Sequence, residues 1–209
     1  MPENLSTMEA KPRTIRHSGH SVDAVEWNTE AQETAIVVVV DGDVLELVSP
    51  LAHMLMDTFR VIGISPESAQ DAVTVVQSLT EPTILLAQGD AGKLACEAAL
   101  LVPAAITALV LADYAPRAGS INHSSLAIPV LVFHGRQSAA ETHAQAVRVH
   151  EEIPGSQLIE LDNCGSLPTK DFPTQLSESV RWFLHEMGKP HMQFADFPGS
   201  EAEPVDPKA

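Results

Sequence analysis

Six short apolar runs recur along the chain and alternate with segments of helical periodicity. The runs are Ala35–Val40, Arg60–Ile64, Thr83–Ala87, Ala108–Ala112, Val130–His134 and Gln157–Leu161. Such alternation predicts an α/β protein, in which a parallel sheet is connected by crossover helices. Because the runs are continuously apolar instead of alternating with polar residues, we expect helices on both faces of a mostly parallel, twisted sheet.

Helical patterns fill the intervals between these runs. They cover Pro50–Thr58, Pro66–Leu79, Asp90–Leu101, Ala139–Glu152 and Pro173–Met187. Ahead of the first apolar run, the segments Thr14–Arg16 and Val22–Trp27 flank the turn residues Ser18-Gly19-His20. We expect these two segments to form an antiparallel hairpin at the edge of the sheet.

The ends of the chain differ in composition from its centre. Residues 1–12 are polar, and residues 189–209 are acidic and proline-rich, with almost no β-branched residues. Such composition predicts disorder, so we expect one folded domain over residues 13–188. Met192, Phe194 and Phe197 are the large apolar residues of the tail; a short docking segment is the alternative to a frayed terminus.

Charge and cysteine content exclude several classes of protein. The 209 residues include 12 Lys and Arg and 28 Asp and Glu, a formal net charge of −16 that repels a phosphate backbone and an anionic membrane alike. The apolar segment 98–112 contains Pro103 and is shorter than the roughly 20 residues of a membrane span. No secretory or transit signal is recognisable, and Cys96 and Cys164 lack disulfide-scaffold or zinc-site spacing. We therefore expect a cytoplasmic protein that binds neither nucleic acid nor membrane.

The junction after the third apolar run, residues 85–92, resembles the nucleophile elbow of the α/β-hydrolase fold family. In that family the motif G-x-S-x-G holds the catalytic serine on a strained strand-to-helix turn. Here the motif reads Ala87-x-Gly89-x-Ala91, so glycine stands at the nucleophile position between small residues. Val39-Val40-Asp41-Gly42-Asp43 resembles the family's oxyanion strand and loop, and the whole resemblance covers about residues 13–187.

Two further segments extend the resemblance. Residues 128–138 resemble the strand that ends in the catalytic acid, and residues 163–168 resemble the histidine loop. The resemblance implies that Gly89, Ser138 and Ser166 occupy the three triad positions and that none of them is catalytic. Short links after the second and fourth apolar runs leave no room for a cap domain, so we expect any pocket to be shallow and open.

Five polar residues are expected around the mouth of this site: Asp41, Asp43, Asp90, Asp113 and His123. Clustered carboxylates would oppose a developing oxyanion. Their oxygens could instead hold Ca²⁺ or Mg²⁺, but the spacing matches no known loop motif, and a solvated acidic face is favoured. No metal and no other cofactor is therefore expected.

Displaced catalytic groups are the alternative to a lost active site. Asp113 lies where some family members carry another acid, but without a histidine to orient, a solvated strand-end carboxylate is favoured. His123 is the histidine expected to reach the mouth and is the candidate base. His134 is interpreted as a satisfied core or boundary residue, and Cys164, without a cationic neighbour, as an inert half-buried thiol.

Two functions stay open at this point. The favoured one is a non-catalytic α/β-hydrolase-fold protein that binds a small molecule or a protein partner, because it explains the triad losses and the missing cap together. The other is a divergent hydrolase or lyase acting through His123 or Asp113 on a small ester-like or carbonyl substrate. A flavodoxin-like domain and a phosphate loop at residues 89–93 are disfavoured by their spacing.

Overall fold

A computed structural model describes residues 10–29, 33–116 and 120–187. The strands are Lys11–His17 (β1), His20–Trp27 (β2), Ala35–Val39 (β3), Arg60–Ile64 (β4), Thr83–Gln88 (β5), Ile106–Ala112 (β6), Val130–Gly135 (β7) and Gln157–Leu161 (β8). β1 includes Lys11 and Pro12, so regular structure begins two residues before the expected domain boundary at residue 13. Residues 1–9 and the predicted tail at 189–209 lie outside the described residues.

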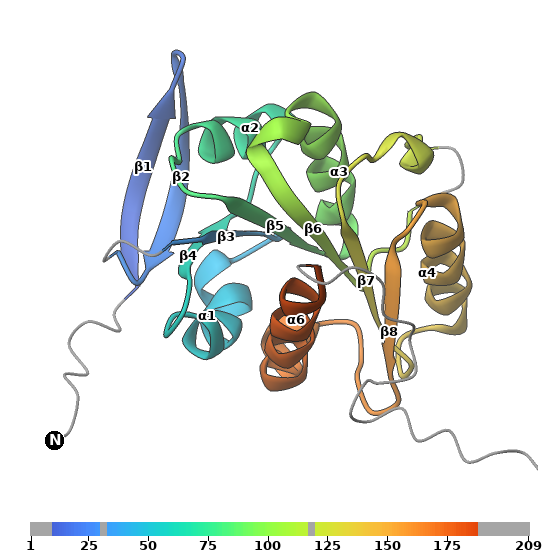
Figure 1. Ribbon diagram of the computed structural model, residues 1–209. Helices are drawn as coiled ribbons and strands as arrows, with labels where there is room; N and C mark the ends of the chain where they lie inside the picture. Colours follow the sequence, from blue (N-terminus) through green and yellow to red (C-terminus); the bar gives the residue numbers. More distant parts are fainter. Residues whose placement is uncertain (1–9, 30–32, 117–119, 188–209) are drawn as a thin grey trace, which may run out of the picture.

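The eight strands form one sheet in the order β1-β2-β4-β3-β5-β6-β7-β8 (Figure 1). β2 pairs antiparallel with both β1 and β4, while all other neighbours are parallel. The predicted edge hairpin and the mostly parallel sheet are therefore confirmed. Since parallel strands share one carboxyl edge, the loops after β3, β5, β6, β7 and β8 all emerge on the same side.

The helices are Val44–Leu55 (α1), Ala69–Gln77 (α2), Gly92–Leu101 (α3), Ala140–Glu152 (α4), Pro168–Asp171 (α5) and Pro173–Met187 (α6). Short 3₁₀ turns cover Gly89–Ala91 (η2), Pro103–Ala105 (η3) and His123–Ser125 (η4). α6 has the predicted bounds, whereas α5 was not predicted. The link from β4 to α2 and the link from β6 to β7 are the places where a cap domain could be inserted. In the described part of these two links, the only helical structure is η4, so these residues form no cap domain.

The start of α1 differs most from the prediction, which placed it at Pro50. The helix begins at Val44 because the Asp43 side chain caps it, accepting a hydrogen bond from the Glu46 N–H at 3.0 Å. Pro50 lies inside the helix, where it has no N–H to donate to the Glu46 carbonyl. The capped first turn therefore decides where the helix begins, and the helix tolerates Pro50 in its interior.

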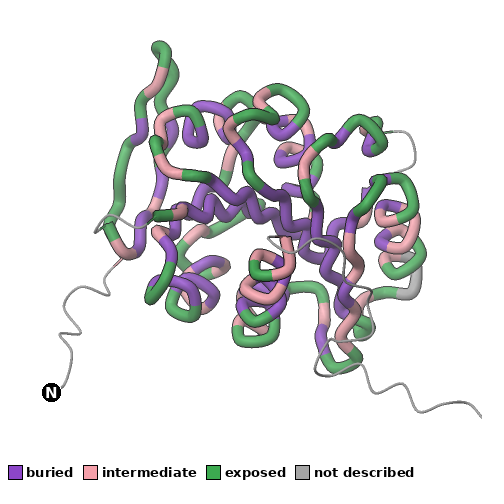
Figure 2. Tube along the Cα trace, in the orientation of Figure 1, coloured by how far each residue is buried: buried purple, intermediate pink, exposed green. Residues whose placement is uncertain are grey.

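The sheet separates two hydrophobic clusters, and its central strands are buried on both faces (Figure 2). Val37 and Leu85 point to the cluster that α2, α3 and α4 cover. Ile36 and Leu86 point to the other cluster, which α1 and α6 cover. Each such buried side chain contributes about 1.5–3 kcal/mol. The continuous apolar runs of the sequence thus reflect strands enclosed by helices on both sides.

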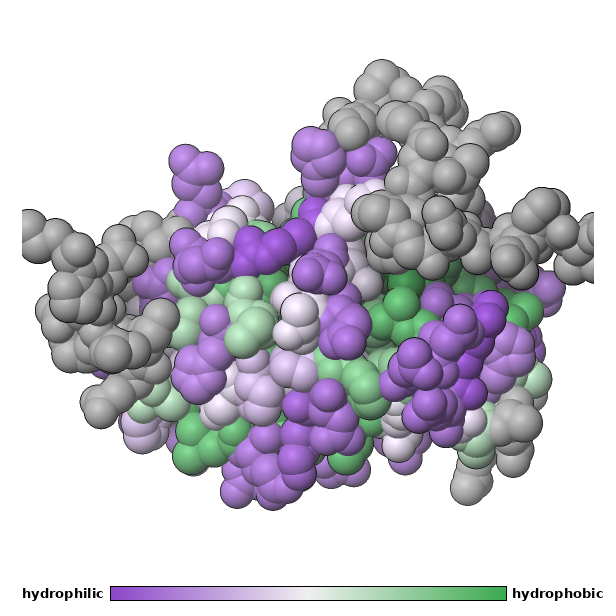
Figure 3. Space-filling model, turned by 90° about the horizontal axis from the view of Figure 1, so that it is seen from below, coloured by the Kyte–Doolittle hydropathy of each residue, from purple (hydrophilic) through white to green (hydrophobic). Residues whose placement is uncertain are grey.

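Some large hydrophobic side chains remain at the surface. Among the described residues, those exposed are Leu45, Met54, Leu100, Leu101 and Leu167. On the face shown in Figure 3, hydrophobic residues lie in separate patches among hydrophilic ones. No helix in the described part of the chain is both long and apolar enough to cross a membrane.

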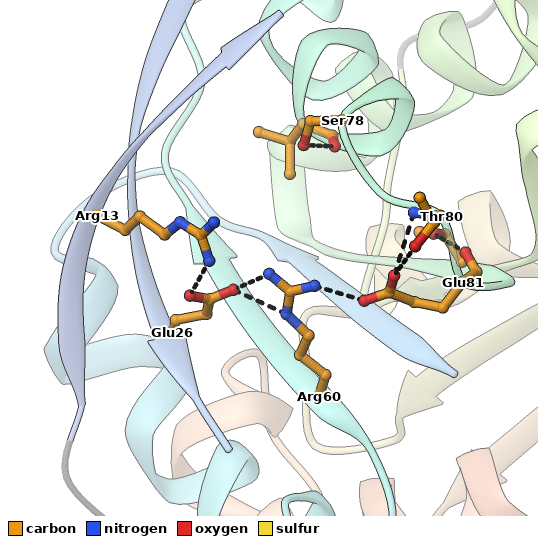
Figure 4. A network of polar contacts seen from close by, with 8 residues as sticks. Arg13, Glu26, Arg60, Ser78, Thr80 and Glu81 are labelled. Atoms are coloured by element: carbon orange, nitrogen blue, oxygen red, sulfur yellow. Dashed lines mark hydrogen bonds and ion pairs between the residues drawn. The ribbon is translucent and has the colours of Figure 1, made fainter. Parts of the chain in front are cut away.

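A partly buried ionic network joins the edge hairpin to the rest of the sheet (Figure 4). The Glu26 carboxylate, 2% exposed, accepts hydrogen bonds from Arg13 Nη1 at 2.7 Å and from Arg60 Nε at 2.8 Å. Arg60 also donates to Glu81. Burial lowers the pKa of Arg60, but the hydrogen bonds to Glu26 and Glu81 outweigh it, so the pKa is raised overall. The network thus links β2 to β4, and each of its two central charges, Glu26 and Arg60, has two partners of opposite charge.

Candidate functional site

The chain turns sharply from β5 into α3 at Gly89. This residue has φ 59°, in the left-handed region that glycine adopts without strain. A Cβ built on Gly89 would meet no atom within 4 Å, so the position faces open space. The turn therefore has the backbone expected of a nucleophile elbow, and it presents no side chain.

Small residues allow α3 to pack closely behind this turn. A Cβ at Gly92 would lie 2.5 Å from Tyr114 Cδ2, which is closer than van der Waals contact permits. Ala91 and Ala95 are buried beside it in the same cluster. The close contact between the start of α3 and the segment after β6 thus depends on Gly92, the residue directly after the motif.

The loops that carry Ser138 and Ser166 meet at the carboxyl edge. The Gln137 N–H donates to the Cys164 carbonyl at 2.9 Å, and a Cβ at Gly135 would collide with that same carbonyl. Ser138 is half-buried and Ser166 is exposed. The two loops therefore lie side by side, as the resemblance requires of an acid loop and a histidine loop.

Asp113 is buried, which corrects the expectation of a solvated carboxylate. The residue follows β6, has φ 51° and is 5% exposed. Its Oδ1 accepts a hydrogen bond from Ser138 Oγ at 2.9 Å and lies 2.9 Å from His134 Nδ1. Asp113 therefore links the end of β6 to the end of β7 beneath the surface and does not line an open mouth.

His134 is fully buried at the end of β7. Although Nδ1 lies close to Asp113 Oδ1, the direction of this contact is unsuited to a hydrogen bond, and neither ring nitrogen forms one within the described part of the chain. The ring also lies against His143, with centroids 5.5 Å apart. His134 is thus a core histidine, as expected, but the expectation that its polar atoms are satisfied is wrong: Nδ1 lies near the Asp113 carboxylate without a hydrogen bond, and Nε2 has no hydrogen-bond partner among the described residues.

His123 is also buried, at 3% exposure, which corrects its placement at the mouth. Its Nε2 lies 3.3 Å from the Tyr114 hydroxyl and its Nδ1 lies 2.7 Å from Glu152 Oε2. These contacts join η4 to the segment after β6 and to the end of α4. The imidazole is therefore engaged in packing on the α4 side of the sheet.

Asp41, Asp43 and Asp90 are exposed at the carboxyl edge. Asp41 follows β3 and Asp90 follows β5, two strands that pair in parallel, while Asp43 caps α1. The described residues contain no group of three or more His, Cys, Asp and Glu side chains that could hold a metal ion. Asp41, Asp43 and Asp90 therefore do not form such a group.

Gln88 and Thr169 form a contact that the sequence did not indicate. Gln88, 5% exposed, accepts hydrogen bonds at Oε1 from the Thr169 N–H at 2.9 Å and from its hydroxyl at 2.5 Å. The neighbouring Lys170 donates to Glu46 at 2.6 Å. These bonds tie α5 to the elbow and to α1. In the sequence, Gln88 is visible as a polar residue at the end of an apolar strand. Its partner cannot be identified there, because Thr169 lies 81 residues away.

Both cysteines are free and buried. Burial raises the pKa of the Cys164 thiol to about 12, and the charges of Asp113 and Asp171 add to the effect. Burial likewise raises the pKa of Cys96 to about 12. Both shifts disfavour the thiolate, which is the reactive form, near neutral pH.

Two hollows lined by described residues lie away from the elbow. One, of about 560 Å³, lies at the end of α2, where His17, Glu81 and Ala105 are among its lining residues. The other, of about 570 Å³, lies between the hairpin and the start of α1, with Arg13 and Ser65 among its lining residues. Neither is lined by Gly89, Ser138 or Ser166.

Comparison with known proteins identifies the architecture. The structure resembles serine hydrolase CCSP0084 from the polyaromatic-hydrocarbon-degrading bacterium Cycloclasticus zankles, with a TM-score of 0.74 and 11% identity over 87% of this chain and 100% of that one. The chain has the α/β-hydrolase fold. The same α/β-hydrolase fold is found in CarC, a serine hydrolase involved in carbazole degradation, with a TM-score of 0.72 and 12% identity over 85% and 99% of the two chains.

Further similarities agree with this fold. Carboxylesterase CesB of Bacillus subtilis matches with a TM-score of 0.66 and 12% identity over 86% of this chain and 94% of its own. Residues 108–190 match the Ndr family, which has the α/β-hydrolase fold. No curated protein matches the sequence significantly. At these identities the structural similarities establish the α/β-hydrolase fold and leave the activity to be argued from the site.

Proposed function

We propose that this chain is a non-catalytic α/β-hydrolase-fold protein that acts as a binding or interaction module. The observation that carries the proposal is the left-handed turn at Gly89. Hydrolases of this fold place their nucleophile on such a turn, between a strand and a helix. Glycine supplies no nucleophile, so the step that starts acyl transfer has no attacking atom at this position.

The neighbouring residues support the proposal. Acyl transfer also needs a base beside the nucleophile and a group that orients the base. The loop after β8 offers the exposed Ser166 and contains no histidine. His123 is buried against Glu152, and His134 is buried beside Asp113, whose carboxylate lies between the imidazole and Ser138. Exposed Asp41 and Asp90 place negative charge at the edge where an oxyanion would form, which opposes its formation.

A divergent hydrolase is the second candidate, and it is suggested by the residues that contact Asp113. Ser138 Oγ and His134 Nδ1 both lie 2.9 Å from its Oδ1, so a serine, a carboxylate and a histidine are in contact. In a catalytic triad the imidazole lies between the other two groups and takes the serine proton. Here the carboxylate lies between them, so the Ser138 hydroxyl is bonded to a group that is a weak base.

Hydrolysis of p-nitrophenyl acetate and butyrate tests the proposal. We expect the wild type, Ser138→Ala and Ser166→Ala to release nitrophenol at the same unsaturable background rate, because neither serine forms a hydrogen bond with a histidine in the described part of the chain. Ser166→Ala is the matched control, since its hydroxyl lies at the same edge. Saturable turnover that Ser138→Ala abolishes and Ser166→Ala keeps would contradict the proposal and support the divergent hydrolase.

A further inference from the structure

We infer that the carboxyl edge of the sheet is an interaction surface and that its partner is a basic protein segment carrying leucine-like apolar side chains. The inference rests on the proposed function and names the partner of the same site. The surface is formed by Asp41, Asp43, Leu45, Asp90 and Leu167, and is called the edge surface below. Two exposed leucines and an excess of carboxylates there carry the inference.

Leu45 and Leu167 are 51% and 37% exposed. The ion pair between Lys170 and Glu46, at 2.6 Å, holds α5 against the first turn of α1. Leu45 directly precedes Glu46, and Leu167 directly precedes α5, so both leucines lie at adjoining helix starts. Exposed apolar residues that are grouped and surrounded by polar ones mark interaction sites more often than single ones do.

The charges around these leucines are predominantly negative. Asp41, Asp43 and Asp90 form no ion pair with any described residue. The basic side chains of the adjoining segments 40–46, 88–93 and 165–171 are Lys93 and Lys170, which are paired with Glu97 and Glu46. The edge surface therefore keeps uncompensated negative charge and complements a positive partner.

The edge surface is also held in place before any partner binds. Asp43 caps α1, and Gln88 binds α5 through both the N–H and the hydroxyl of Thr169. A partner therefore does not have to order these segments, which lowers the entropic cost of association. A second copy of this chain fits less well, because it would bring carboxylates against carboxylates.

The chain also provides a control for exposed leucines. Leu100 and Leu101, 36% and 61% exposed, end α3, whose start lies at the elbow on the carboxyl edge. The segment 98–112 around them contains no charged residue. If exposed leucines alone were sufficient, both pairs of leucines would contribute to binding of the partner. If negative charge is also needed, only Leu45 and Leu167 on the edge surface would contribute.

Binding of a fluorescent amphipathic peptide made only of leucine and lysine, followed by anisotropy with the full chain, tests the inference. We expect Leu45→Ser/Leu167→Ser to weaken binding by about tenfold, and Leu100→Ser/Leu101→Ser to change it by less than about twofold. Asp41→Asn/Asp90→Asn should weaken binding by about threefold and reduce its dependence on salt. This charge variant leaves both leucines and the Asp43 cap intact, so it tests the surface even if the serine variant unfolds.

Three outcomes would overturn the inference: no binding by the wild type, equal losses in the two leucine variants, or unchanged binding and salt dependence in the aspartate variant. Circular dichroism and melting curves establish that each variant is folded. The ester assay separates failure of this inference from failure of the proposed function. A protein that neither turns over the esters nor binds the peptide would overturn the inferred partner and leave the non-catalytic role intact. A protein with saturable turnover would instead contradict the non-catalytic role itself.

Discussion

Two neighbouring strands, β5 and β6, end in the same unusual backbone conformation and differ in what they hold there. Gly89 after β5 has φ 59° and Asp113 after β6 has φ 51°. The space around a Cβ at Gly89 is empty, whereas the Asp113 carboxylate is buried against Ser138 and His134. At these two turns, the residue that carries a side chain is the one whose side chain has buried partners, and these partners offset the backbone strain.

Removal of the Asp113 carboxylate should produce the largest effect. We expect Asp113→Ala to lower the free energy of unfolding by about 3 kcal/mol, because it strands the buried groups that face the carboxylate and puts alanine at positive φ. Asp113→Asn is the control, since it keeps an acceptor oxygen and tolerates the left-handed region. Urea melts check both; equal stability of Asp113→Ala and the wild type would show that the two turns do not differ as described.

Addition of a side chain at the other turn should cost less. We expect Gly89→Ser to lower the free energy of unfolding by about 1–2 kcal/mol through backbone strain alone, since no atom obstructs the Cβ. Gly89→Asn should cost less than serine, because asparagine enters the left-handed region more readily. Denaturant midpoints measure the series, and a raised midpoint for Gly89→Ser would contradict the elbow geometry.

Loss of the hydroxyl that joins α5 to the elbow should have a smaller effect. Thr169→Val keeps the shape and the N–H bond to Gln88 but removes the second bond, so we expect about 1 kcal/mol of destabilisation. The matched control is Thr174→Val, where the threonine is exposed and its hydroxyl has a long contact of 3.9 Å with the Met54 sulfur, so the change should be nearly neutral. Thermal melts of both variants measure the difference. Equal melting temperatures of Thr169→Val and Thr174→Val would mean that the buried hydroxyl bond does not stabilise the attachment of α5 to the elbow.

The smallest expected effect is an alkaline loss of stability from Cys96. Burial raises its pKa from the ordinary thiol value of 9.0 to about 12 in the folded chain, so the unfolded chain loses the thiol proton first and binds fewer protons. Its contribution is therefore complete well below pH 9 and declines as pH rises through 9 toward 12, by about 0.4 kcal/mol between pH 7 and pH 9. Urea melts of the wild type and Cys96→Ala at both pH values measure it. A steeper alkaline decline in Cys96→Ala would contradict the sign.

Most of the fold could be predicted because its signals are local. The continuous apolar runs gave the bounds of β4 and β8, and turn residues gave the hairpin. α1 shows the limit of such signals, since Pro50 was interpreted as a helix start although the cap at Asp43 decides the boundary. A hydrogen bond from Glu46 to Asp43 is visible in the sequence only as an acidic residue three positions before another.

The side-chain pairing of the site could not be predicted, because it depends on contacts between distant segments. Strand ends at residues 113 and 134 come together only when β6 and β7 pair, which turns a supposedly solvated Asp113 into a buried partner of His134. His123 was placed at the mouth from its position in a linker, but its contact with Glu152 places it on the α4 side. Sequence distance alone indicates neither contact.

Labelling with a serine-reactive fluorophosphonate, read by intact mass, tests the central claim most directly. The claim is that Gly89 forms an elbow without a nucleophile and that neither Ser138 nor Ser166 replaces it. We predict that neither the wild-type chain nor Ser138→Ala gains mass after incubation, because neither Ser138 nor Ser166 forms a hydrogen bond with an imidazole in the described part of the chain. Ser156 lies 2.8 Å from His150 Nδ1, but it is buried and its hydroxyl donates to backbone carbonyls. A single stoichiometric adduct on the folded wild type, mapped to Ser138 or Ser166, would contradict the account.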